Sequence, residues 1–227
     1  MATVVAAVVG MIRRDTATLA RNSSVAKRGR AWCYSVHARK TKGADVNRSY
    51  RWATEKGGGL EHVELDCGDA GVKAEGVLIG PPGGRLFACS YALRCDEHWQ
   101  VRSLDVHVAG QGTVCLRADG AGNWTDADGM PLPALQGCTD IDLSGSPFTN
   151  TLPIRRLGDA LRDRQEIRVA YIDLPKLDVQ PVSQAYTRLA PDRVRFDSLS
   201  RPFTAELEVD ADGLVLHYPS LFTRVGG

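Results

Sequence analysis

The chain has 227 residues, of which 43% are hydrophobic, enough for an ordinary buried core and too many for a globally disordered protein. No apolar run approaches the ~18 residues that a membrane-spanning helix needs, so we expect no transmembrane segment. The net charge of +1 is unevenly spread, because nine Lys or Arg and one Asp in residues 1–43 leave −7 for residues 44–227. Since the acidic body lacks the basic surface of a nucleic-acid-binding domain, we expect no nucleic-acid partner.

The N-terminal segment differs in composition from the rest. An apolar run over residues 2–12 is followed at once by two arginines, the reverse of the order in a secretory signal. Residues 13–43 are rich in Arg, Ser and Ala, as in a transit peptide, although an over-long start or a disordered tail has the same composition. We assign residues 1–45 to an N-terminal extension, disordered or targeting, and residues 46–227 to one domain. A cytoplasmic location is expected, or a mitochondrial or plastid one if the extension is a transit peptide.

The cysteines and the acidic turns predict no cofactor. Six cysteines are spread over more than a hundred residues without a Cys-x-x-Cys pair, which favours a reducing compartment over a disulfide framework or a zinc site. Two Asp-Ala-Asp-Gly stretches, at 126–129 and 210–213, lack the remaining ligands of a calcium loop and are typical of turns. We therefore expect neither a metal nor an organic cofactor.

Short runs with apolar residues at every second position follow one another from residue 48 to residue 223. The clearest are residues 104–108, 167–171, 205–209 and 214–218, and Gly, Pro and Asp separate them. Period-two runs with turns every ~8–12 residues predict antiparallel hairpins. One face of such a sheet would lie on a core and the other on solvent or a ligand.

One helix is expected, within residues 147–157. Gly158 follows it at the position of a C-terminal cap. Thr149, Asn150 or Thr151 could cap its start, since short polar side chains accept hydrogen bonds from the first backbone N–H groups.

A pair of carboxylates precedes this helix. Asp140 and Asp142 flank one residue, so on a strand they share a face at a separation of ~7 Å, within reach of a glycosidase-like pair. The simpler interpretation is a solvated face, or partners for Arg155 and Arg156. We predict that Arg155 anchors the helix through a bidentate ion pair with Asp140 or Asp142, together with the caps at the helix start.

His62 is a candidate general base. It follows Glu61 directly, so a strand would point the two side chains to opposite faces. A histidine with a purely structural hydrogen bond is the alternative.

Three tryptophans are candidates for sugar stacking. Trp52, Trp99 and Trp124 lie at expected strand edges or turns beside polar residues. An indole face packs on the CH face of a sugar, while polar neighbours bind hydroxyl groups. The alternative is core packing with a satisfied indole N–H.

Several motifs occur in a distinctive order over residues 48–224. They are Tyr50-Arg-Trp52, Gly59-Leu-Glu-His62, Tyr91-x-x-Arg-Cys-Asp96-x-x-Trp99, Leu116-x-Ala-Asp-Gly-Ala-Gly-x-Trp-Thr-Asp126, Leu135-x-Gly-Cys-x-Asp-Ile-Asp142, Pro147-Phe-Thr-Asn-Thr-Leu-Pro-Ile-Arg-Arg-Leu157, Gln184-x-Tyr-Thr187 and Val209-Asp-x-Asp-Gly-Leu-Val215. Together they resemble the bacterial "putative glycolipid-binding" family, whose fold is a spiral β-roll.

The resemblance implies a mainly β fold, in which a long curled antiparallel sheet wraps around a single short α-helix, and a homodimer. It further implies a non-catalytic binding or carrier protein for an amphiphile, with a lipid or glycolipid as partner. The alternatives are a protein-interaction module with a closed core and a hydrolase of a lipid or sugar. The predicted ligand-binding residues are Trp52, His62, Trp99, Trp124, Asp140, Asp142, Asn150, Arg155 and Tyr186; no catalytic residue is assigned.

Overall fold

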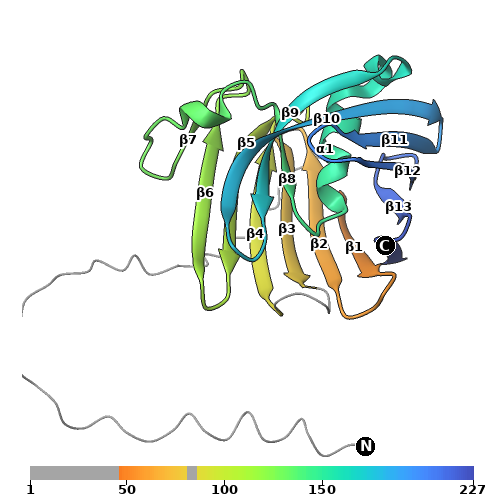
Figure 1. Cartoon of the computed structure of the whole chain (residues 1–227), viewed down its shortest axis with the longest axis horizontal. Helices are drawn as coiled ribbons and strands as arrows, with labels where there is room; N and C mark the ends of the chain where they lie inside the picture. Colours follow the sequence, from red (N-terminus) through yellow and green to blue (C-terminus); the bar gives the residue numbers. More distant parts are fainter. Residues whose placement is uncertain (1–45, 81–85) are drawn as a thin grey trace, which may run out of the picture. The chain divides into compact units, whose positions relative to one another are not determined.

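In the described part of the chain, alternating apolar residues form fourteen β-strands that join into one curled sheet (Figure 1). The computed structural model describes residues 46–80 and 86–227, and the extension predicted for residues 1–45 lies outside this part of the chain. The strands are β1 (Val46–Thr54), β2 (Leu60–Gly68), β3 (Gly71–Ile79), β4 (Ala88–Cys95), β5 (Val101–Val108), β6 (Gly112–Ala118), β7 (Trp124–Thr125), β8 (Asp140–Leu143), β9 (Gln165–Asp173), β10 (Asp178–Ala190), β11 (Arg193–Ser198), β12 (Phe203–Val209), β13 (Val215–Tyr218) and β14 (Phe222–Gly226).

Their order in the sheet is β7-β6-β5-β4-β3-β2-β1-β14-β13-β12-β11-β10-β9-β8. Neighbouring strands are antiparallel hairpins, as predicted, and β1 pairs with β14. The predicted long curled sheet is confirmed; its one parallel pair within the described residues is at the edge, where β8 pairs with β9 and Asp140 lies opposite Val169. The chain between β8 and β9 crosses over through helical segments and therefore re-enters the sheet in the same direction.

Strand β3 illustrates how alternation places side chains. Val72 and Ala74 are buried, while Lys73 and Glu75, which alternate with them, are exposed. Gly76 continues the buried face, and a Cβ at this position would lie 2.2 Å from the Tyr91 ring of the neighbouring strand. Glycine is required here because the ring packs directly on the backbone.

The helical crossover has three parts: η2 (Phe148–Asn150), α1 (Thr151–Leu157) and η3 (Gly158–Arg162), while a separate 3₁₀ turn, η1, spans Pro133–Leu135. Gly158 ends α1 with φ +52°, which confirms its predicted role as a cap. The predicted side-chain cap at the start is wrong, because Asn150 is itself in helical conformation and makes no capping bond. The turn η2 runs straight into α1, and the N–H of Thr151 is bonded to backbone oxygens of η2 instead.

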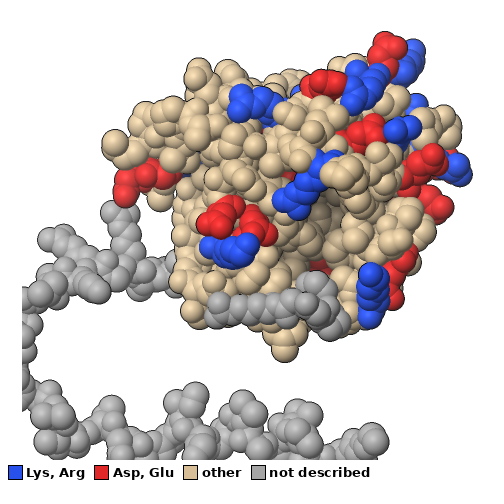
Figure 2. Space-filling model, viewed as in Figure 1, with Lys and Arg blue, Asp and Glu red and all other residues tan. Residues whose placement is uncertain are grey.

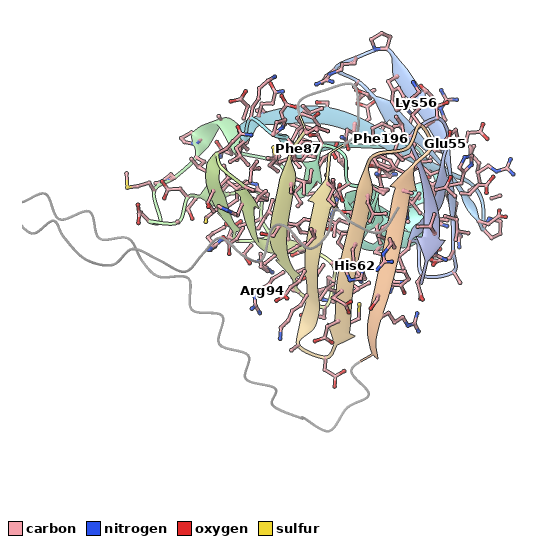
Figure 3. The ribbon with its side chains drawn as sticks, turned by 90° about the horizontal axis from the view of Figure 1, so that it is seen from below. Glu55, Lys56, His62, Phe87, Arg94 and Phe196 are labelled. Carbon is pink, nitrogen blue, oxygen red and sulfur yellow. The ribbon has the colours of Figure 1, made fainter. Side chains whose placement is uncertain are left out.

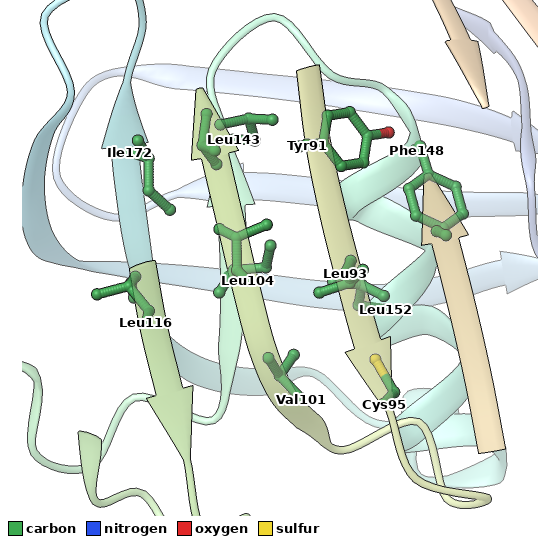
Figure 4. Packing of buried hydrophobic residues seen from close by; sticks show 14 of the residues in the cluster. Tyr91, Leu93, Cys95, Val101, Leu104, Leu116, Leu143, Phe148, Leu152 and Ile172 are labelled. Atoms are coloured by element: carbon green, nitrogen blue, oxygen red, sulfur yellow. The ribbon is translucent and has the colours of Figure 1, made fainter. Parts of the chain in front are cut away.

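Helix α1 is enclosed by the curled sheet (Figure 1), and apolar side chains fill the space between them. Leu152 and Phe148 pack with Leu93 and Leu104 of the sheet, all at most 1% exposed (Figure 4). A second cluster surrounds Ile154. The inner face of the roll around the helix is therefore packed with protein side chains.

On the face seen in Figure 2, basic and acidic side chains are interspersed rather than segregated. No helix among the described residues is both long and apolar enough to cross a membrane.

Candidate functional site

A cavity of about 230 Å³ opens beside the start of the helical crossover. We call it the aromatic cavity, and its walls come from β8, the β8–η2 loop and strands β9 to β14. The lining residues used below are Asp142, Asn150, Tyr171, Gln184, Phe196, Arg201, Phe203, Tyr218, Leu221 and Phe222.

Four aromatic rings from four consecutive strands form one wall. Phe196, Phe203, Tyr218 and Phe222 belong to β11, β12, β13 and β14, in each case near a hairpin turn at the same end of the sheet. The ring centroids of Phe203 and Tyr218 are 6.2 Å apart, and those of Tyr218 and Phe222 are 6.5 Å apart. Phe203 is 40% exposed, so its ring is accessible at the mouth of the cavity.

The polar part of the lining belongs to a chain of hydrogen bonds. Gln184 Nε2 donates to Asp142 Oδ2 at 2.6 Å, and the Tyr186 hydroxyl donates towards Gln184 Oε1 at 3.3 Å and Asn150 Oδ1 at 3.1 Å. Thr149 Oγ1 lies 3.5 Å from the other Asp142 oxygen. Each buried polar group fixes the orientation of the next, so the Gln184 amide is held in a single direction.

Burial sets the acid–base properties of this region. It raises the pKa of Asp142, while hydrogen bonds from Gln184 and Thr149 and the charge of Arg201 act in the opposite direction. Burial raises the pKa of the Tyr186 hydroxyl well above its ordinary value, so this group stays a neutral donor. Arg201 lies at the rim, with its guanidinium 5.6 Å from the centre of the Tyr171 ring.

Of the nine predicted binding residues, Asp142 and Asn150 line this cavity, and Tyr186, which is outside the lining, is bonded to Asn150 through its hydroxyl group. Trp99 and Arg155 meet elsewhere, with the guanidinium 5.1 Å above the indole ring. The sequence analysis thus predicts members of two separate hollows.

Trp52 and Trp124 occupy core positions at 0% and 3% exposure. The indole N–H of Trp52 donates to the Val215 carbonyl at 2.7 Å, and the indole N–H of Trp124 donates to the Cys138 carbonyl at 2.9 Å. These positions match the alternative of core packing with a satisfied N–H, and we assign neither residue to the site.

His62 and Glu61 point to opposite faces of β2. His62 is half-buried, and its Nε2 lies 2.9 Å from Glu64 Oε1 on the same face of β2. In the sheet, four strands separate β2 from β11, which carries Phe196 (both residues are labelled in Figure 3). Glu61 is fully buried and accepts hydrogen bonds from the hydroxyls of Tyr91, at 2.7 Å, and Ser146, at 2.6 Å. Burial raises the pKa of Glu61 to about 7. The sequence analysis missed Glu61, although its position two residues before the buried Val63 was a usable signal.

The predicted ion pair of Arg155 with Asp140 or Asp142 is wrong, because the partner of Asp140 is Arg156. Arg156 Nε lies 3.0 Å and Nη2 2.6 Å from the Asp140 carboxylate, which is 0% exposed. Successive helical residues differ by about 100° in direction, so only Arg156 faces β8. Arg155 points instead to Trp99 and to the backbone oxygen of Asp212, at 3.3 Å.

The residues considered for a hydrolase are thereby dispersed. Asp140 is neutralised by Arg156, Asp142 is bonded to Gln184, and His62 lies on another face of the sheet. Among residues 46–80 and 86–227, no group of three or more His, Cys, Asp or Glu side chains could hold a metal ion.

Comparisons with known proteins agree with the motif order. The family described as "Putative glycolipid-binding" matches residues 49–224. The crystal structure of a DUF1089 family protein from Pseudomonas aeruginosa is 36% identical, with 84% of this chain and 99% of that one covered and a TM-score of 0.65. No curated protein matches the chain.

Proposed function

The chain belongs to the "putative glycolipid-binding" family, and from that premise we propose that it is a non-catalytic binding protein that holds a glycolipid headgroup in the aromatic cavity. The observation that carries this proposal is that one cavity is lined both by an aromatic wall and by the hydrogen-bonded pair Asp142 and Gln184.

Sugar recognition needs both sides of this arrangement. The CH face of a pyranose is apolar and packs on aromatic rings, which Phe203 and Tyr218 offer at the mouth. The hydroxyl groups need fixed acceptors and donors, which the Asp142 carboxylate and the Gln184 and Asn150 amides supply. Because these polar groups are already oriented by one another, a bound sugar would order few additional side chains.

The size of the cavity favours the headgroup over the lipid tail. A volume of about 230 Å³ corresponds to roughly eight water molecules at ~30 Å³ each. This space suits a single sugar ring and is too small for the acyl chains of a lipid. The chains would instead lie over apolar side chains of the lining that reach the surface, where Phe203 is 40% and Leu221 38% exposed.

Isothermal titration calorimetry with alkyl glycosides tests the proposal. Octyl glucoside, kept below its critical micelle concentration, should bind more tightly than methyl glucoside, because each methylene covered at the mouth contributes ~0.8 kcal/mol. Phe203→Ala should weaken octyl glucoside binding by about tenfold, since it removes a stacking face and apolar area. Asp142→Asn should weaken both glycosides, because it removes the charged acceptor while preserving side-chain shape.

Ile79→Ala is the matched control for Phe203→Ala. Ile79 is an apolar strand residue with 48% exposure, and it does not line the aromatic cavity. Its replacement should leave glycoside affinity unchanged. If Phe203→Ala and Ile79→Ala bind octyl glucoside as the unmodified protein does, the aromatic cavity is not the binding site. Absence of binding by every glycoside would contradict the proposed function as a whole.

A further inference from the structure

A second hollow lies at the other end of α1. The aromatic cavity adjoins Asn150, before the first residue of α1, whereas the second hollow adjoins Gly158, after the last. The second hollow has a volume of about 410 Å³. We call it the arginine groove, because Arg155, Arg156 and Arg188 contribute to its lining.

Two of these arginines lack a close carboxylate partner. Arg188 Nη1 donates to the Pro191 carbonyl at 3.2 Å and forms no ion pair with a carboxylate of the described residues. Arg155 Nη1 lies 3.9 Å from Asp212 Oδ1, too far for a hydrogen bond. The other carboxylate oxygen, Oδ2, binds Arg48 at 2.7 Å. Positive charge in the groove is therefore incompletely neutralised.

The remaining charged groups in the lining do not cancel this excess. Arg156 is neutralised by Asp140. Asp210 binds Arg224 at 2.6 Å, which leaves Glu97 at the rim, with a side chain 63% exposed. The groove thus presents more unmatched guanidinium than carboxylate groups.

Trp99 fixes the direction of one of these guanidinium groups. The Trp99 ring is 8% exposed and its centre lies 5.1 Å from the Arg155 guanidinium carbon. Because Arg155 Nη1 donates to the Asp212 carbonyl at 3.3 Å, the other N–H groups of the guanidinium are the ones left to bind a ligand. Trp99 has a φ of +63°, a conformation that bulky side chains rarely adopt. The β4–β5 turn would be less strained with glycine at this position, and the indole instead packs in the core beside Arg155.

A smaller hollow of about 160 Å³ shares Trp99 and Arg155 with the groove. Tyr50, Leu65 and Leu214 give it apolar surface, and Arg48 and Asp212 also line it. A cationic groove next to a hollow with apolar surface suits an anionic group that carries a short hydrocarbon portion.

From this geometry we propose that the arginine groove is an anion site for a phosphate group, held by the guanidinium edges of Arg155 and Arg188. Guanidinium groups bind phosphate through paired charge-assisted N–H···O bonds, and the two arginines face one hollow. The phosphate can come from a phosphorylated amphiphile or from a soluble phosphate. This site is separate from the aromatic cavity and does not depend on glycoside binding there.

Titration calorimetry with inorganic phosphate and with octyl phosphate, below its critical micelle concentration, distinguishes the two sources. Binding to the arginine groove should weaken at least tenfold in Arg155→Met and in Arg188→Met, because each loses charge-assisted bonds. It should also weaken as sodium chloride is added, since salt screens partly exposed charges. Arg168→Met is the matched control, because Arg168 also donates to a backbone carbonyl, of Gln136 at 2.9 Å, but lies outside the groove.

Octyl phosphate binding more tightly than inorganic phosphate would identify an amphiphile, and equal affinities would identify a soluble phosphate; both support the site. Thermal unfolding without ligand checks that each variant is folded. If Arg155→Met does not fold, Arg188→Met alone decides, because Arg188 lies in a strand and is only half-buried. No binding of either phosphate, or equal losses in Arg168→Met and Arg188→Met, would overturn the proposal.

Discussion

Replacing Arg156 by methionine tests how the helical crossover is held to the sheet edge. Methionine keeps the length of the aliphatic stem and removes the guanidinium group. Asp140 would then be left 0% exposed, with the Thr139 hydroxyl at 2.9 Å as its remaining side-chain donor. Removing one member of a buried ion pair leaves the other charge buried without a partner, which costs ~3–5 kcal/mol. The free energy of unfolding should therefore fall by that amount.

Urea denaturation followed by circular dichroism measures this loss, and the m-value should stay constant if only stability changes. Arg155→Met is the control one residue away. Its side chain is 38% exposed with a carboxylate partner at 3.9 Å, so its loss should cost less than ~1 kcal/mol. In the double variant Asp140→Asn with Arg156→Met, much of the lost stability should return, because no buried charge remains. An Arg156→Met protein as stable as Arg155→Met would refute this account of the anchor.

Three further predictions concern stability. Because burial raises the pKa of Glu61 from 4.5 to about 7, the folded protein binds this proton more tightly than the unfolded chain does. This bound proton adds up to ~3 kcal/mol to the free energy of unfolding; the contribution is complete below pH ~4.5 and is lost as the pH rises through 7. Urea unfolding at a series of pH values should show this loss, and Glu61→Gln should flatten the pH dependence. Gly76→Ala should destabilise the protein by ~1–3 kcal/mol, because the new Cβ would overlap the Tyr91 ring. Gly226→Ala is the control and should be tolerated, since the atom nearest to its Cβ would be Arg51 Cβ at 3.7 Å. Equal effects of the two substitutions would contradict the packing argument. Removal of residues 1–45 should shift Tm by less than ~3 °C in calorimetry, and loss of folded protein would refute their dispensability.

The sequence predicts the strands well because one period determines both structure and burial. Alternation in β3 and β5 identifies strands and the face that each buries. Gly158 marks the helix end, since only a residue tolerant of positive φ fits there. The curl of the sheet around the helix came from the family resemblance and not from alternation, which says nothing about curvature.

The site was harder to predict because it is assembled from distant segments. Asp142 and Gln184 are 42 residues apart, and no local pattern indicates that β8 returns beside β9, whose other neighbour is β10. Phe196 and Phe203 gave no signal of their own beyond their proximity to a turn. Their convergence depends on the register of consecutive hairpins.

The tryptophans illustrate a second limit of sequence reasoning. Polar neighbours suggested half-exposed rings at Trp52 and Trp124, yet both point inward, because adjacent strand residues face opposite sides of the sheet. Arg155 and Arg156 posed the same difficulty on the helix, where a one-residue step selects a different partner.

The position of a bound sugar ring tests the central claim most directly. A crystal structure of the protein with octyl glucoside should place the pyranose against Phe203 and Tyr218, with a hydroxyl group hydrogen-bonded to Asp142 and the octyl chain directed over Leu221. A pyranose bound elsewhere, with the aromatic cavity holding only water, would contradict the assignment of this cavity as the headgroup site.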